Sequence, residues 1–209
     1  MATFDERARD WDTPERIDRA GRVAAAIEEA VPLRKTDRLV DVGAGTGLLG
    51  IALADDVGEI VLADPSAGMI EVAKEKLAAA GLRSVRAVRH DLLVDPPLAD
   101  GFDVAVSLLV LHHIQDTATA LAAIRDLLVP GGRIGLADLD TEDGSFHTAD
   151  AEGIHHLGFD RSALTQLAGA AGFVDVATRT ATVIDEDADG GGYPVFLLTG
   201  RRPADQGSA

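Results

Sequence analysis

The apolar residues of this chain follow two alternating patterns, which together predict a layered α/β fold. Short apolar runs are typical of buried strands, and they occupy residues 39–42, 60–63, 85–88 and 102–110. Apolar residues at helical spacing lie around these runs, over residues 14–30, 69–80, 118–128 and 160–171. Strands that alternate with helices in this way indicate a parallel sheet with helices on both faces.

Several helix ends are marked by residues suited to them. Thr13 followed by Pro14 is typical of an N-cap and a first helical residue, and Gly81 is typical of a helix end. Asp160 is a further N-cap, for a helix that ends at Gly172. Three more strands are expected at residues 133–137, 173–183 and 193–199.

Residues 38–66 contain a glycine turn between the first strand and the next helix. Gly43, Gly45 and Gly47 follow that strand, and the second strand ends in Asp64. Glycines permit positive φ and let a ligand lie against the backbone at a helix N-terminus. Asp64 stands 19 residues after Gly45, close to the roughly 20 expected for a carboxylate that binds ribose hydroxyls. The stretch therefore predicts a nucleoside-cofactor site, in which Asp64 has little structural duty.

The glycine spacing separates two classes of cofactor. A dinucleotide fingerprint, G-x-G-x-x-G, would need a glycine at position 48, where the chain has Leu48. Asp41 stands two residues before Gly43, where a carboxylate would repel a pyrophosphate but suit a cationic amino-acid ligand. The pattern D-x-G-x-G-x-G therefore disfavours NAD(P).

This pattern resembles motif I of the class I S-adenosylmethionine-dependent methyltransferases. Three further matches follow in the family's order, namely Asp91 just past the third strand, residues 111–116 after the fourth, and the proline–glycine turn at 129–132. The resemblance covers roughly residues 38–138. It implies one α/β domain over residues 1–200 with a Rossmann-like, doubly wound, seven-stranded sheet. That sheet would be mostly parallel, with an antiparallel last strand between strands five and six, followed by a flexible tail at 201–209.

The resemblance also implies which residues hold S-adenosylmethionine. Residues 1–31 would form a lid and helix over it, Asp64 would bind the ribose, and Asp91 would accept from the adenine amine. The expected cofactor residues are Trp11, Asp41, Gly43, Ala44, Gly45, Gly47, Asp64, Pro65, Met69, Asp91, Leu92, Leu108 and His113. Two alternatives stay open: Trp11 as a staple for the helix start, and Met69 as ordinary core. His90 is expected at the surface.

Composition narrows the class of partner. The formal net charge of −16 argues against nucleic acid, whose phosphates would be repelled. The chain has no cysteine, which excludes disulfides, thiolate nucleophiles and zinc–cysteine sites. No apolar run reaches the roughly 20 residues of a membrane span, and the N-terminus is too charged for a signal peptide. These features predict a cytoplasmic monomer or homodimer that acts on a small-molecule acceptor.

An acidic, histidine-bearing insertion at residues 139–160 leaves strand five on the edge where open α/β sheets bind ligands. Histidine titrates near neutrality, so His147 and, in reserve, His156 are the candidate general bases. Carboxylate neighbours are expected to favour the charged form of His147. The histidines in segments expected to border the substrate are His112, His113, His147, His155 and His156.

A metal site is the alternative for this insertion. Asp138, Asp140, His147, His155 and His156 include ligand types that bind divalent ions. Adjacent histidines cannot both point the same way on a regular helix or strand, so no metal is expected. Three functions remain open: a methyltransferase, a catalytically silent cofactor-binding regulatory domain, and an NAD(P)-dependent oxidoreductase. The sequence favours the first, because every cofactor-facing position named above is intact.

Overall fold

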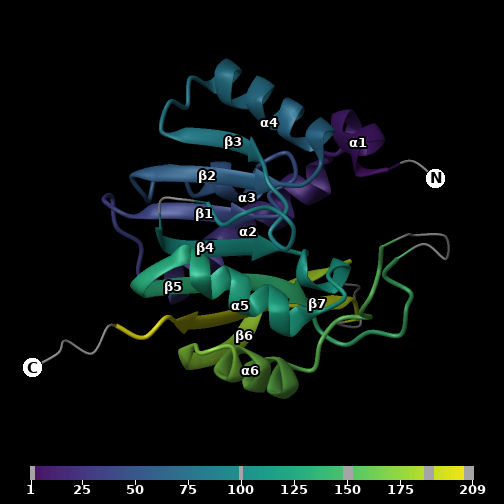
Figure 1. The fold of residues 1–209 in the computed structure, drawn as a ribbon. Helices are drawn as coiled ribbons and strands as arrows, with labels where there is room; N and C mark the ends of the chain where they lie inside the picture. The colour runs from purple at the N-terminus through teal and green to yellow at the C-terminus, as the bar shows by residue number, and fades with distance from the viewer. Residues whose placement is uncertain (1–2, 99–100, 148–152, 186–190, 205–209) are drawn as a thin grey trace, which may run out of the picture.

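The computed structural model of this chain describes residues 3–98, 101–147, 153–185 and 191–204. Its strands form one seven-stranded sheet in the order β3-β2-β1-β4-β5-β7-β6 (Figure 1). The strands are β1 (Arg38–Val42), β2 (Glu59–Asp64), β3 (Val85–Arg89), β4 (Phe102–Leu108), β5 (Leu128–Leu139), β6 (Val174–Ile184) and β7 (Tyr193–Arg201). Strands β1 to β5 pair in parallel, whereas β7 is antiparallel to both β5 and β6. The predicted doubly wound sheet is confirmed, including its inserted last strand.

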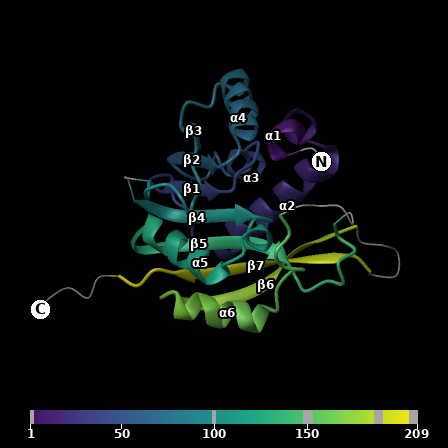
Figure 2. The ribbon, with the colours of Figure 1, turned by 45° about the vertical axis from the view of Figure 1, so that its right-hand side comes forward.

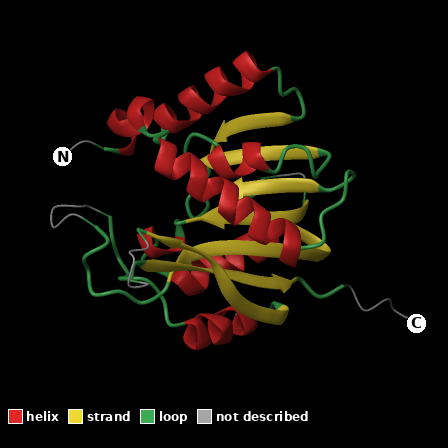
Figure 3. Ribbon diagram, turned by 180° about the vertical axis from the view of Figure 1, so that it is seen from behind, coloured by secondary structure: helices red, strands yellow, loops and turns green. Residues whose placement is uncertain are grey.

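Helices cover both faces of this sheet. Seen from behind, one face carries α2 (Pro14–Ala30), α3 (Leu48–Ala52) and α4 (Ala67–Ala80) (Figure 3). The other face carries α5 (Thr117–Leu127) and α6 (Arg161–Ala170) (Figure 2). Short helical turns are α1 (Phe4–Arg7) and η1 (Ala8–Asp10) before α2, and η2 (Leu111–His113) after β4.

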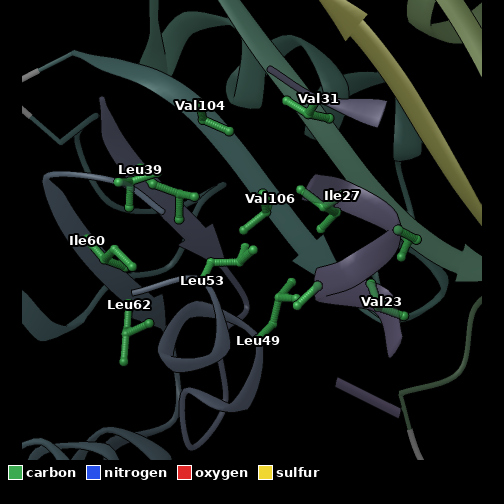
Figure 4. Packing of buried hydrophobic residues seen from close by; sticks show 14 of the residues in the cluster. Val23, Ile27, Val31, Leu39, Leu49, Leu53, Ile60, Leu62, Val104 and Val106 are labelled. Atoms are coloured by element: carbon green, nitrogen blue, oxygen red, sulfur yellow. The ribbon is translucent and has the colours of Figure 1, made fainter. Parts of the chain in front are cut away.

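Each face of the sheet has its own apolar core. Ile27 of α2 and Leu53, the residue after α3, pack with Leu39 of β1 in the first core (Figure 4). Leu121 of α5 and Phe196 of β7 belong to the second core. All five side chains are fully buried, and each contributes about 1.5–3 kcal/mol on burial. These cores fix the strand ends, and hence the site, rigidly.

The predicted helix caps are present. The Thr13 hydroxyl accepts from the Arg16 backbone, and Asp160 accepts from the Ala163 backbone at 2.8 Å. Gly81 ends α4 in the left-handed conformation with φ of 67°. Local sequence therefore set these boundaries as expected.

Two boundaries differ from the sequence prediction. The proline–glycine turn at 129–132 lies within β5, because Leu128 already pairs with Phe102 of β4. The predicted tail is wrong at its start, since Arg201 belongs to β7 and the Arg202 backbone donates to the Gly132 carbonyl at 2.7 Å. Residues 205–209 of that tail lie outside the described residues. Among the described residues, no helix combines the length and apolar character that crossing a bilayer requires.

Candidate functional site

A pocket of about 500 Å³ opens at the carboxyl ends of β1, β2 and β4. This volume is within the usual range for small-molecule sites. Most of the predicted cofactor residues line it, namely Trp11, Asp41, Gly43, Ala44, Gly45, Asp64, Pro65, Met69, Asp91, Leu92, Leu108 and His113. Gly47, also predicted to contact the cofactor, does not line this pocket. A Cβ on Gly47 would lie 2.5 Å from Leu62, which shows that this glycine serves close packing of α3 on β2.

The glycine turn forms the floor of the pocket. Gly43 has φ of 67°, and a Cβ there would lie 2.6 Å from Val110, so no larger residue fits. A Cβ on Gly45 would instead meet nothing closer than 3.8 Å, the nearest atoms being those of Trp11 and Met69. Open space therefore lies directly against the Gly45 backbone, as an approaching ligand requires.

Asp64 connects the end of β2 to this turn. One carboxylate oxygen accepts from the Gly45 N–H at 2.8 Å, and the other accepts from the Ser66 N–H at 2.8 Å. The side chain is largely buried, and burial raises the pKa of Asp64 above its ordinary value. The expectation that Asp64 has little structural duty is wrong, because it holds two backbone groups in place.

Asp41 lies deeper, beneath the turn. Its side chain is 1 % exposed, and its Oδ2 accepts from the Gly50 N–H at 2.9 Å. Burial, with a smaller effect of the nearby Asp64, raises the pKa of Asp41 to about 7. A buried carboxyl group of this kind ionises most readily when a cation enters beside it. Asp41 therefore suits a ligand that carries an ammonium group.

The N-terminal segment closes one side of the pocket. Lys76 on α4 donates to the Asp12 carboxylate at 2.6 Å and to the Thr46 carbonyl at 2.9 Å. Asp5 accepts from the Gly68 N–H at 2.9 Å. Trp11 lies between these two anchors and lines the pocket, with the Arg16 guanidinium 4.1 Å from the centre of its ring. Trp11 thus lines the pocket, as the lid interpretation requires, and contacts the first turn of α2 through Arg16, as the staple interpretation requires.

The opposite end of the pocket lies beyond β3. Asp91 accepts from the Leu93 N–H at 3.0 Å, and its own N–H donates to Asp95. His90, expected at the surface, is only 7 % exposed and lines the pocket. Its N–H donates to the Asp64 carbonyl at 3.0 Å, which continues the β3–β2 ladder and draws the residue inward. Met69 is buried, as its core interpretation requires, and it also lines the pocket.

A buried histidine–aspartate pair lies behind the pocket wall. His112 Nδ1 lies 2.6 Å from the Asp138 carboxylate, and the two residues are 1 % and 0 % exposed. The adjacent His113 lines the pocket, and its Nδ1 lies 2.9 Å from the Gly153 carbonyl. Burial, reinforced by His112, lowers the pKa of His113 to about 4. The sequence named His112 and Asp138 separately but did not pair them.

Comparison with known proteins agrees with this geometry. Residues 40–134 match the family described as "Methyltransferase domain". One solved structure, a complex of the Haloferax volcanii Trm112 activator with a methyltransferase, has a TM-score of 0.78 at 21% identity and covers 97% of this chain and 99% of its own. The family match and the shared fold support a class I S-adenosylmethionine-dependent methyltransferase.

Individual relatives fit this methyltransferase assignment. The uncharacterized methyltransferase Rv0089 of Mycobacterium tuberculosis is 35% identical over 117 residues, which is 56% of this chain and 57% of that protein. A demethylmenaquinone methyltransferase of Clavibacter sepedonicus is 32% identical over 145 residues, covering 67% of this chain and 58% of that protein. The Haemonchus contortus phosphoethanolamine N-methyltransferase 2, solved with S-adenosyl-L-methionine, has a TM-score of 0.70 at 16% identity, covering 87% of this chain and 52% of that one. The chain thus spans less than two thirds of the curated relatives' lengths.

The insertion at residues 139–160 differs from its sequence prediction in the electrostatics of His147. Burial, with His112 nearby, lowers the pKa of His147, although Glu142 and Asp138 act in the opposite direction. The two carboxylates favour the charged form, as expected, but burial outweighs them, so the net shift is opposite to the one expected. His156 is held structurally, because its Nε2 lies 3.0 Å from the Ile114 carbonyl and 3.2 Å from the Thr117 hydroxyl.

The candidate metal ligands are not brought together. Asp140 forms a two-pronged ion pair with Arg161, with both N–O distances 2.6 Å. Asp138 is engaged with His112, and His155 is exposed. Within the described part of the chain, no three His, Cys, Asp or Glu side chains are arranged to hold a metal ion.

Proposed function

We propose that this chain binds S-adenosylmethionine and transfers its methyl group to a small-molecule acceptor. The observation that carries the proposal is the open space against the Gly45 backbone, bordered by Asp64 on one side and Trp11 on another. The cofactor, once bound, supplies a methyl group on a positively charged sulfur. The protein positions the cofactor and the acceptor, and it removes the acceptor's proton.

Different pocket residues contact different parts of the cofactor. Asp64 accepts hydrogen bonds from ribose hydroxyls, and Asp41 faces the amino group, directly or through water. Asp91 accepts from the adenine amine. The remaining contacts come from the backbone of the glycine turn and from apolar side chains, namely Gly43, Ala44, Gly45, Pro65, Met69, Leu92 and Leu108, with Trp11 and His113 closing over them.

The acceptor lies on the side of the pocket bordered by His113 and the insertion that carries His147. Among the relatives are a demethylmenaquinone methyltransferase and the ubiquinone biosynthesis O-methyltransferase of Cereibacter sphaeroides, the latter 34% identical over 113 residues. Aromatic hydroxyl compounds are therefore the first acceptors to screen. The net charge of −16 supports a small molecule over nucleic acid. We extend the proposal to a cytoplasmic protein that acts as a monomer or homodimer.

Calorimetric titration with S-adenosylmethionine, S-adenosylhomocysteine and NAD tests the proposal. Binding of the first two, and loss of affinity in Asp64→Ala, is the expected result. Binding of NAD alone would overturn it. Tight cofactor binding without turnover across the acceptor screen would instead support a silent regulatory domain.

A further inference from the structure

Three unpaired polar atoms gather beside the proposed acceptor side. Among the described residues, the buried side-chain atoms without a hydrogen-bond partner include His112 Nε2, His147 Nε2 and Glu142 Oε1. Folded proteins pair nearly all buried polar atoms, because an unpaired one costs about 1–3 kcal/mol. Three such atoms on neighbouring residues indicate a site where a polar ligand supplies the missing hydrogen bonds.

His112 is held in one orientation and one tautomer. Its Nδ1 lies 2.6 Å from Asp138 Oδ1, and a carboxylate oxygen can only accept, so Nδ1 carries the hydrogen. Asp138 is itself fixed, because it also accepts from the backbone N–H groups of His112 and Leu139 at 3.2 and 2.8 Å. Nε2 of His112 is therefore left with a free lone pair, the form of imidazole that takes up a proton.

The insertion places its own polar groups over this histidine. The ring of His147 lies 5.1 Å from the ring of His112, centre to centre. Glu142 uses one oxygen to accept from the Gly144 and Phe146 N–H groups at 2.7 and 3.1 Å, which leaves the other oxygen unpaired. The ring of Phe146 packs edge-on against His147 with 4.7 Å between centres. The surroundings thus combine two imidazoles, a carboxylate and an aromatic wall.

This cluster adjoins the cofactor pocket. The His113 ring lines the pocket and lies 4.1 Å from the His112 ring, centre to centre. Phe4 of the lid packs edge-on against His113 at 5.4 Å. The titratable groups that face His112 are Asp138 from β5, His113 from η2 and His147 from the insertion. The cluster therefore lies directly behind the part of the pocket wall that His113 forms.

We infer that the acceptor is a phenol-type hydroxyl compound whose proton is taken by His112 Nε2, with Asp138 positioning the imidazole. This inference rests on the proposed function and names its acceptor class. A hydroxyl acceptor must lose its proton as the new bond forms, which is the step that a positioned imidazole base assists. An aromatic acceptor also matches the ring-lined surroundings formed by Phe4, Phe146 and His113.

The proposed methyl transfer conserves atoms, charge and electrons. The hydroxyl proton moves to His112 Nε2 as the acceptor oxygen forms its bond to the methyl carbon. The carbon–sulfur bond breaks, and its electron pair stays on sulfur as a neutral thioether. His112, now a cation stabilised by Asp138, returns its proton to solvent after the methyl ether leaves. His147 and Glu142 contact the acceptor's remaining polar groups.

Binding of 4-nitrophenol tests this assignment without the cofactor. At pH 6, binding to the wild-type protein is expected to raise the absorbance of the nitrophenolate form, because His112 takes the proton. His112→Gln is expected to lose that absorbance change, and to lower turnover by about 10²–10⁴ with any phenol the screen finds. His155→Ala, which alters an exposed histidine on the same insertion, is the matched control and retains the change.

Each other outcome overturns the inference. Those outcomes are failure of 4-nitrophenol to bind, binding without ionisation, and ionisation that persists in His112→Gln. If His112→Gln does not fold by circular dichroism, proton–nitrogen NMR of the wild-type histidine rings replaces it. His112 must then be the imidazole that gains a proton on adding 4-nitrophenol, and protonation of another histidine contradicts the assignment. S-adenosylmethionine binding is measured separately, so failure of the cofactor proposal is distinguishable from failure of this one.

Discussion

The Asp64 carboxylate accepts a hydrogen bond from the Gly45 N–H, with 2.8 Å between oxygen and nitrogen. This contact joins the end of β2 to the turn after β1. A second hydrogen bond, from the Ser66 N–H, holds the other carboxylate oxygen. One side chain thus shapes the glycine turn and presents a carboxylate to the pocket, so binding and folding are coupled at this residue.

Asp64→Ala is expected to weaken S-adenosylmethionine binding by about 1.5–3 kcal/mol, the range for lost hydrogen bonds to a charged group. It should also lower the free energy of unfolding by about 1–3 kcal/mol, because two backbone N–H groups lose their acceptor. Calorimetry and urea unfolding measure the two effects. Asp55→Ala, at an exposed carboxylate, is the control and should change neither. Full stability in Asp64→Ala would contradict the structural role.

Asp41 predicts a pH-dependent cofactor affinity. Its pKa of about 7 means that the free protein holds this carboxyl mostly protonated below pH 7. An ammonium group beside it favours the ionised form, so binding releases a proton. Affinity should therefore fall by up to about tenfold for each pH unit below 7, which is about 1.4 kcal/mol. Titrations from pH 5.5 to 7.5 measure this slope, and Asp41→Asn should abolish it. A flat wild-type profile would separate Asp41 from the ammonium group.

If the N-terminal segment acts as a lid, a substitution at its anchor Lys76 should change the rate of cofactor dissociation. Lys76→Met removes the contacts to Asp12 and to the Thr46 carbonyl, at 2.6 and 2.9 Å. Cofactor dissociation should accelerate, with a loss of about 1 kcal/mol in affinity, the upper range for such an ion pair. Stopped-flow displacement measures the rate. Arg9→Ala, which breaks exposed ion pairs with Glu75 and Glu71, is the matched control and should leave the rate unchanged. Equal effects of both variants would argue against the lid.

Gly158 lies near the end of the insertion, where the backbone passes close to Asp140. Its φ is 70°, and a Cβ there would lie 2.0 Å from the Asp140 carbonyl oxygen. Gly158→Ala should therefore displace the segment that accepts hydrogen bonds from Thr141 and Glu142. The expected stability loss is roughly 2–4 kcal/mol, and acceptor turnover should fall while cofactor affinity stays.

The matched control for that variant is Gly153→Ala. Gly153 has a similar φ of 74°, but a Cβ there meets nothing within 4 Å. It should show only the cost of left-handed backbone, about 1–2 kcal/mol. Thermal unfolding of both variants isolates the clash, and equal losses would show that the close approach at Gly158 is unimportant.

The sequence by itself determined the features that depend on neighbours in the chain. Thr13, Gly81 and Asp160 cap their helices because a cap needs only the next few residues. The same holds for Gly43 and Gly45, whose positive φ belongs to a local turn. The parallel sheet with helices on both faces followed as well, because strands and helices alternate along the chain. The place of the antiparallel last strand came from the resemblance to the methyltransferase family.

Tertiary structure alone decided the features that depend on burial and on distant partners. His112 and Asp138 are 26 residues apart in sequence, and they meet because β4 and β5 pair side by side. The direction of the His147 pKa shift depends on how completely the fold excludes water, which no spacing records. His90 turned inward for a similar reason, through a ladder hydrogen bond to β2. The glycine turn and the family resemblance therefore named most of the pocket residues, whereas the packing of distant segments created the buried histidine–aspartate pair behind the pocket wall.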